Sequence, residues 1–231
     1  MPARSTALAS VAALAISAAA GAMAEPTACS DPMLAVDAPD PAIAERVCAA
    51  AMTAKAQLAT CGLTQSRAVS MEIVPQIDGP SDTCVGLYHC GTDRISLVAP
   101  SAVAEVMPGD SVFATLDPEV YYDSLIVHEL AHALMEQAEC AHPRCDSDKE
   151  YVAYAMQFLS LPQSARDTLL SWRERPEEVP QERLNDILLW MKPDIFAFTA
   201  WAHFDGLDDG CAFVQGVVRG ETTLKLPESL P

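Results

Sequence analysis

The stretch from 118 to 138 constrains the fold more than any other part of this sequence. Asp117-Pro118-Glu119 is a typical helix start, with a capping acid, a proline in the first turn and an acid near the positive end of the helix dipole. The residues that follow are apolar on nearly every side of the helix: Leu125, Ile126, Val127, Leu130, Ala131, Ala133, Leu134 and Met135. We therefore predict a helix that is buried among other elements.

Three polar side chains interrupt this apolar helix, in the order His128-Glu129-x-x-His132. Four residues advance a helix by about 400°, so the two imidazoles lie on one face and can reach the same ion. Glu129 points about 100° round from His128, where its carboxylate can reach a water on the metal. Unpartnered burial of these groups is unfavourable, whereas one metal satisfies all three. We predict a Zn²⁺ site with His128 and His132 as ligands and Glu129 as the catalytic residue.

A hydrolytic zinc site has three protein ligands, so the third must come from beyond this helix. Glu136 and Glu139 continue the same helix and cannot fold back onto the metal. His142 lacks the glycine that would let the chain turn early. Asp146 and Asp148 stand where helix caps are expected. Glu150 is nearly the only ionisable group in the apolar stretch that follows it. We predict that Glu150 is the third ligand, although bonding to backbone amides or to Arg144 is the alternative.

The motif and its spacing resemble a known group of enzymes. His-Glu-Leu-Ala-His followed by Glu150 after seventeen residues is similar to the glutamate zincins, and residues 150–162 resemble the ImmA/IrrE-like metallopeptidase pattern. The resemblance covers about 125–162. The cysteines and the long helical tail depart from it, and these departures indicate a separate exported bacterial family. It implies a zincin-like fold and metal-assisted peptide hydrolysis in which Glu129 takes a proton and passes it to the leaving amine. Tyr154 and His203 are the available oxyanion-stabilising groups, although packing and a surface position are their simpler roles.

The first residues predict export. A single charge at Arg4 precedes the apolar run 7–20, and Ala22-Met23-Ala24 fits a signal peptidase site. The run is shorter than the roughly 20 residues of a spanning helix. We predict a signal peptide at 1–24 and a single domain at 25–231, released to the periplasm or secreted without a membrane anchor.

Charge and cysteine content agree with export. The formal charge is −18, and removal of Arg4 makes it −19, which repels nucleic acid and anionic lipid. The eight cysteines form an even set without CxxC pairs, and we expect four disulfides. Cys84 with Cys90 and Cys140 with Cys145 can close small loops. The remaining four pair in an order that is left open: Cys29, Cys48, Cys61 and Cys211.

Periodicity and turn signals predict an α+β fold. A helix is expected at 41–63, then a small antiparallel sheet of about three strands at 69–77, 85–89 and 95–98, the last two joined by a hairpin turn. Residues 100–117 read as an irregular connection. A mostly helical half follows the helix at 118–138, with further helices from 146 to about 162, at 164–173, at 181–191 and around 194–203.

Three functional hypotheses fit these features. The first is an exported zinc peptidase acting on a peptide or protein substrate, with the oligomeric state left open. The second is a zincin-fold protein that binds zinc for partner docking without catalysis. The third is a disulfide-rich binding domain in which the motif is incidental. Intact Glu129 favours the first over the second, and the apolar surroundings of the motif disfavour the third.

Overall fold

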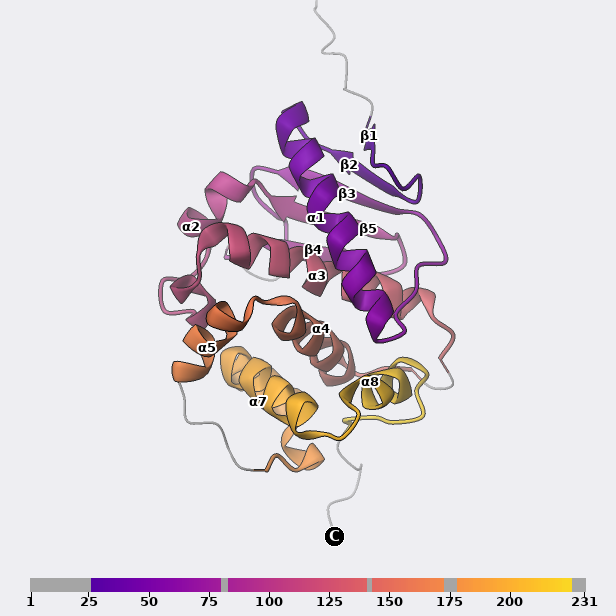
Figure 1. Ribbon diagram of the computed structural model, residues 1–231, viewed down its shortest axis with the longest axis vertical. Coiled ribbons are helices and arrows are strands. Elements are labelled where there is room, and N and C mark those ends of the chain that lie inside the picture. The colour runs from indigo at the N-terminus through magenta and orange to yellow at the C-terminus, as the bar shows by residue number, and fades with distance from the viewer. Residues whose placement is uncertain (1–25, 80–82, 141–142, 173–177, 226–231) are drawn as a thin grey trace, which may run out of the picture.

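A computed structural model describes residues 26–79, 83–140, 143–172 and 178–225 (Figure 1). The predicted signal peptide therefore lies outside the described residues. The described chain is α+β, as expected: the first part of the chain forms a five-stranded sheet with one helix between its strands, and the remaining helices follow.

The sheet is mixed, so the prediction of an antiparallel sheet is wrong. Its strands lie in the order β1-β2-β3-β5-β4. The pairs β2–β3 and β3–β5 are parallel, whereas β1–β2 and β4–β5 are antiparallel. The strands are β1 (Thr27–Ala28), β2 (Leu34–Asp37), β3 (Val69–Val74), β4 (Gly86–His89) and β5 (Arg94–Val98).

Helix α1 (Pro41–Thr60) causes the parallel pairing, because a helix that connects two neighbouring strands returns the chain to the same end of the sheet. The Asp40 side chain caps the start of α1 by accepting a hydrogen bond from the Ala42 N–H at 2.9 Å. Gly62 follows the end of α1 with φ 79°, a conformation that glycine adopts without strain. The helix expected at 41–63 is therefore confirmed, but β2 before it was missed.

The connection at 100–117 holds three short helical pieces: η1 (Pro100–Ala102), α2 (Val103–Val106) and η2 (Val112–Thr115). The predicted buried helix is α3 (Pro118–Gln137), capped by Asp117, whose carboxylate accepts from the Glu119 N–H at 3.0 Å. α3 packs against α4 (Asp146–Ser160), α1 and β4 (Figure 1). This packing buries nearly every face of α3, as its sequence predicts.

The last third of the described chain is helical. α5 (Gln163–Ser171) and α7 (Pro193–Gly206) confirm two predicted helices, and α7 lies beside α4 (Figure 1). The helix predicted at 181–191 is shorter: η3 (Gln181–Arg183) precedes α6 (Asp186–Met191), because Asn185 caps a new start by accepting from the Leu188 N–H. α8 (Gly210–Val218) was not predicted.

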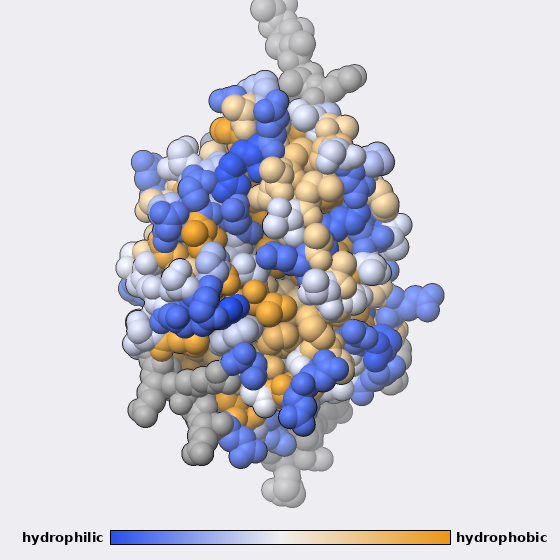
Figure 2. All heavy atoms as spheres, in the orientation of Figure 1, coloured by the Kyte–Doolittle hydropathy of each residue, from blue (hydrophilic) through white to orange (hydrophobic). Residues whose placement is uncertain are grey.

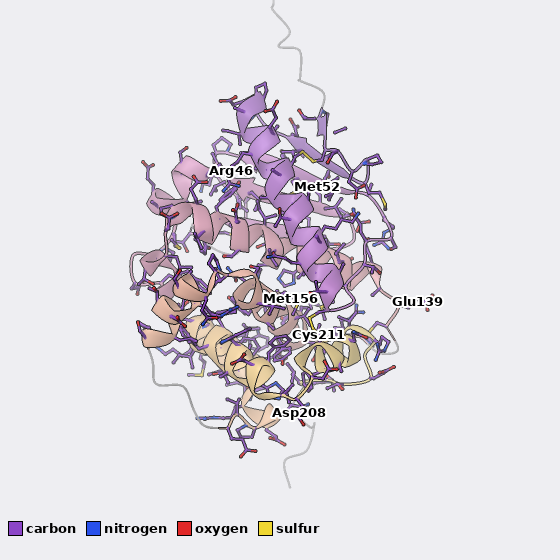
Figure 3. All side chains as sticks on the ribbon, in the orientation of Figure 1. Arg46, Met52, Glu139, Met156, Asp208 and Cys211 are labelled. Atoms are coloured by element: carbon purple, nitrogen blue, oxygen red, sulfur yellow. A yellow bond between two sulfur atoms is a disulfide. The ribbon has the colours of Figure 1, made fainter. Side chains whose placement is uncertain are left out.

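Two disulfides join the described residues, Cys29–Cys48 and Cys61–Cys211. The second connects the end of α1 to α8, and Figure 3 labels Cys211 beside the C-terminal end of α1. The expected Cys84–Cys90 bridge is wrong, because both residues are thiols. The extended strand β4 lies between them and is roughly 10 Å long from its first to its last Cα atom, which exceeds the Cα separation of a disulfide. The Cys140–Cys145 bridge is wrong too, because the Cys145 thiol instead lies 3.2 Å from the Ser147 hydroxyl.

Figure 2 shows one face of the molecule, where hydrophilic residues are interspersed with smaller hydrophobic areas. In the described part of the chain, no helix combines the length and apolar character that crossing a membrane requires.

Candidate metal centre

Helices α3 and α4 bring three predicted ligands together. The Nε2 atoms of His128 and His132 lie 3.2 Å apart, because the two residues are one turn apart on α3. Each Nε2 is 3.4 Å from one carboxylate oxygen of Glu150, which stands in the first turns of α4. The ligand atoms of the three residues all lie within 4.8 Å of one another, so this group could hold a metal ion.

The separations suit a tetrahedral ion. Ligand atoms at about 2.0–2.1 Å from a tetrahedral zinc are roughly 3.3–3.4 Å apart. The measured separations of 3.2 Å between the imidazole nitrogens and 3.4 Å from each nitrogen to Glu150 match this spacing. Two imidazoles and one carboxylate also form a ligand set found in catalytic zinc sites, which leaves a fourth position open. The residues present therefore fit a divalent ion.

The protonation states of Glu150 and His132 agree with metal binding, whereas burial, which would lower the pKa of His128, is outweighed by Glu150, which raises it. Burial alone would raise the pKa of Glu150, but the imidazoles of His132 and His128 outweigh it and lower this pKa to about 2. Burial, helped by the neighbouring His128, lowers the pKa of His132 to about 4 despite the charge of Glu150. At neutral pH Glu150 is therefore an anion and His132 a neutral base, the forms that bind a metal.

Gln157 orients His128 from behind. Its side chain is 2% exposed, and its Oε1 lies 3.1 Å from His128 Nδ1. A carbonyl oxygen can only accept, so His128 carries its proton on Nδ1 and presents the Nε2 lone pair towards His132 and Glu150. Gln157 is fixed in turn, because its Nε2 donates to the Ser124 hydroxyl at 3.2 Å and that hydroxyl donates to the Tyr121 carbonyl at 2.7 Å.

Glu129 lies beside the ligand group and is held by strand β4. Its side chain is 5% exposed and accepts a hydrogen bond from the Tyr88 backbone N–H. β4 approaches so closely that a Cβ built on Gly86 would lie 2.8 Å from Glu129 Oε1. Burial, with the nearby charge of Glu150, raises the pKa of Glu129 to about 7, although His128 and the Tyr88 N–H act in the opposite direction. This pKa suits a group that accepts and returns a proton near neutral pH.

The ligand group opens onto a cleft of about 980 Å³. Strand β4 lines the cleft with Gly86, Leu87 and Tyr88, and the aromatic rings of Phe113, Tyr121 and Tyr154 also line it. The Tyr154 ring centroid lies 4.7 Å from that of His128. His203 is elsewhere: it is buried in α7, does not line the cleft, and its Nδ1 is 2.8 Å from the Tyr151 hydroxyl. Of the two candidate oxyanion-stabilising residues, only Tyr154 lies beside the ligand group.

The structure also places the rejected ligand candidates. Asp148 is buried and caps α4, where it accepts from the Cys145 N–H at 3.0 Å and the Leu224 N–H at 2.7 Å. Asp146 pairs with Lys149, and Glu136 accepts from the Gly91 N–H. Glu139 is exposed and projects away from the body of the molecule (Figure 3). His142 lies outside the described residues.

Sequence reasoning missed three residues of this site: Gly86, Tyr121 and Gln157. Tyr121 precedes His128 by seven residues and Gln157 follows Glu150 by seven, so two helical turns place each on the face of the ligand. Helical spacing could have identified both. Gly86 had no such signal, because its role depends on how β4 packs against α3.

Fold and site together define an α+β protein with a His-His-Glu group that could hold a metal ion. The chain belongs to the family of unknown function DUF6639, whose model matches residues 34–227 and thus spans the whole site. Searches among curated proteins and among solved structures found no match. The similarity to glutamate zincins and to ImmA/IrrE-like metallopeptidases therefore rests on the sequence motif.

Proposed function

We propose that this protein is an exported zinc-dependent peptidase that hydrolyses peptide bonds in the cleft between β4 and α3. The observation that carries the proposal is the convergence of His128, His132 and Glu150 at tetrahedral spacing, with the buried Glu129 carboxylate beside them. A bound zinc ion would supply Lewis-acid activation of a water and of the scissile carbonyl.

The chain's own residues account for the remaining steps. The Tyr88 N–H holds the Glu129 carboxylate, which takes a proton from the attacking water and delivers it to the leaving amine. The raised pKa of Glu129, about 7, suits both directions of this transfer. Tyr154 lines the cleft with its ring against His128, and its hydroxyl is our candidate for stabilising the developing oxyanion.

A peptide substrate suits the shape of the cleft. β4 lies at the edge of the sheet, with β5 as its only partner among the described strands. Its residues Gly86, Leu87 and Tyr88 line the cleft, and an edge strand can pair with an extended peptide through backbone groups that are not already hydrogen-bonded, as the Tyr88 N–H is to Glu129.

Export is the second part of the proposal. The signal-like segment at 1–24 and the two disulfides support an oxidising location such as the periplasm or the exterior.

One experiment separates this function from its alternatives. Zinc is measured in the purified protein, and hydrolysis of a mixed peptide library is followed for the wild type and Glu129→Gln. We expect about one zinc per chain in both proteins and at least a hundredfold loss of hydrolysis in the variant. Glu139→Gln makes the same chemical change at an exposed position and serves as the control. Zinc without hydrolysis would indicate docking without catalysis, and absence of zinc would indicate an incidental motif.

A further inference from the structure

The cleft contains a permanent positive charge that no carboxylate neutralises. Arg144 lies in the connection between α3 and α4, is partly buried and lines the cleft. No ion pair to Arg144 occurs among the residues that the structure describes. Lys149 also lines the cleft, but its amine pairs with Asp146 at 3.3 Å. Of these two cations, Arg144 is therefore the one whose charge is left for a ligand.

Backbone carbonyls at two helix ends hold the guanidinium group of Arg144 in place. Its Nε donates to the Val218 carbonyl at 3.0 Å, where α8 ends, and its Nη2 donates to the same carbonyl. Nη2 also donates to the carbonyl of Ala138, the residue that follows α3, at 3.3 Å. The last carbonyls of a helix have no partner within the helix, and its negative dipole end favours a cation. The guanidinium is thus fixed before any ligand binds.

These contacts leave one nitrogen of Arg144 unused. A guanidinium carries five N–H donors in one plane, and Nη1 makes no hydrogen bond to any residue in the described part of the chain. The two carbonyls occupy Nε and Nη2 but bring no full negative charge. A carboxylate would supply both the acceptor for Nη1 and the missing charge, and such charge-assisted hydrogen bonds are among the strongest in proteins.

The position of Arg144 along α3 fits a substrate that extends from the metal centre. Ala138 follows His132 by six residues, so it lies roughly 9 Å further along the helix. An extended peptide covers about 3.3 Å per residue, so this distance corresponds to about three residues. A carboxylate about three residues from the scissile bond can therefore reach Arg144 while the scissile carbonyl lies at the metal centre.

We propose that Arg144 binds a carboxylate of the substrate through Nη1, about three residues from the bond that is cut. The inference rests on the proposed peptidase function and names its substrate class. The carboxylate belongs either to the C-terminus of a short peptide or to an aspartate or glutamate side chain. Because the net charge of −18 repels strongly acidic polypeptides, a single carboxylate is the expected ligand, and not an acidic tract.

The test compares ionised and neutral forms of the same peptide. Fluorescent peptides carry a free or an amidated C-terminus, and a second amidated set carries glutamate or glutamine at a scanned position. Their Kd is measured on zinc-loaded Glu129→Gln protein, while the wild type is assayed for cleavage. We expect the free C-terminus or the best-placed glutamate to bind about tenfold tighter than its neutral counterpart, as for one charge-assisted hydrogen bond. Which set shows the preference identifies the source of the carboxylate.

Variants then assign the preference to Arg144. Arg144→Gln, added to Glu129→Gln, should reduce the preference to about twofold or less. Arg144→Lys keeps the charge without the planar fork and should keep an intermediate preference. Arg183→Gln removes an equal charge from an exposed position outside the cleft and should leave the preference unchanged. A merely structural role of Arg144 would instead weaken ionised and neutral peptides alike.

The outcomes separate the two proposals. A carboxylate preference that depends on Arg144 supports the subsite even if the wild type cleaves no peptide, which would overturn only the peptidase. Cleavage by the wild type without a carboxylate preference would overturn the subsite and leave the peptidase in place. A preference that survives Arg144→Gln, as for a carboxylate bound by the zinc itself, would also overturn the subsite. If Arg144→Gln does not fold, equal affinity of ionised and neutral peptides for the Glu129→Gln protein would still refute it.

Discussion

Substitution of Gly86 by alanine tests how the catalytic carboxylate is positioned. The added Cβ would lie 2.8 Å from Glu129 Oε1, 3.0 Å from Glu129 Cγ and 3.0 Å from Leu125 Cδ1. Glu129 ends in a flexible carboxylate, so we expect the side chain to move while the backbone stays in place. The fold should therefore be destabilised by only about 1 kcal/mol.

The size of the effect follows from these contacts. Ordinary carbon–oxygen contact begins near 3.4 Å, so Oε1 must shift by roughly 0.6 Å. A displacement of 1 Å at a reacting group can reduce the rate about a hundredfold, so we expect roughly a tenfold fall in kcat. Zinc content should stay at the wild-type level, because the three atoms nearest to the new methyl group belong to Glu129 and Leu125 and not to His128, His132 or Glu150.

The assay measures kcat, KM, zinc content and thermal unfolding of the Gly86→Ala protein. Gly109→Ala is the matched control, because a Cβ at Gly109 meets nothing within 4 Å. The reasoning is refuted if Gly86→Ala folds, binds zinc and keeps full kcat. It is equally refuted if Gly86→Ala and Gly109→Ala lose the same activity.

Three further predictions concern the ligands, their support and the disulfides. Glu150→Ala should lose zinc, whereas Asp148→Ala should keep it. Because Asp148 caps α4, its replacement should lower the free energy of unfolding by about 1–3 kcal/mol. Equal zinc content in the two variants would remove Glu150 from the site. Gln157→Leu should weaken zinc binding at least about tenfold in a chelator competition, and Gln157→Glu, which keeps an acceptor for His128 Nδ1, should restore most of it. Replacing both Cys61 and Cys211 by alanine should lower the unfolding free energy in urea by about 5 kcal/mol, against about 3 kcal/mol for Cys29 with Cys48, because the closed loops differ in length. An order reversed between the two pairs would contradict the loop-length argument.

The sequence predicted those features that local chemistry determines. Asp40 with Pro41 and Asp117 with Pro118 start helices by capping, so the starts of α1 and α3 could be located from their residues. The apolar surround of His128 and His132 indicated burial, and the isolation of Glu150 in an apolar helix identified its role as a candidate ligand. Each of these signals is confined to a few neighbouring residues.

Long-range features were outside the reach of such signals. The parallel pairing of β2 and β3 depends on α1 crossing over the sheet, and β2 is only four residues long. The Cys61–Cys211 pair spans 150 residues, whereas the predicted pairs were chosen because they were near in sequence. Gly86 meets Glu129 only because β4 packs against α3.

Zinc K-edge absorption spectroscopy on the purified protein tests the metal centre most directly. Cys84, Cys90 and Cys145 are thiols and could each offer a sulfur ligand to adventitious zinc, and sulfur and nitrogen ligands differ clearly in bond length. We predict nitrogen and oxygen neighbours at about 2.0–2.1 Å, with imidazole scattering from His128 and His132. Sulfur neighbours at about 2.3 Å, or zinc that is retained after both histidines are replaced, would contradict the proposed centre.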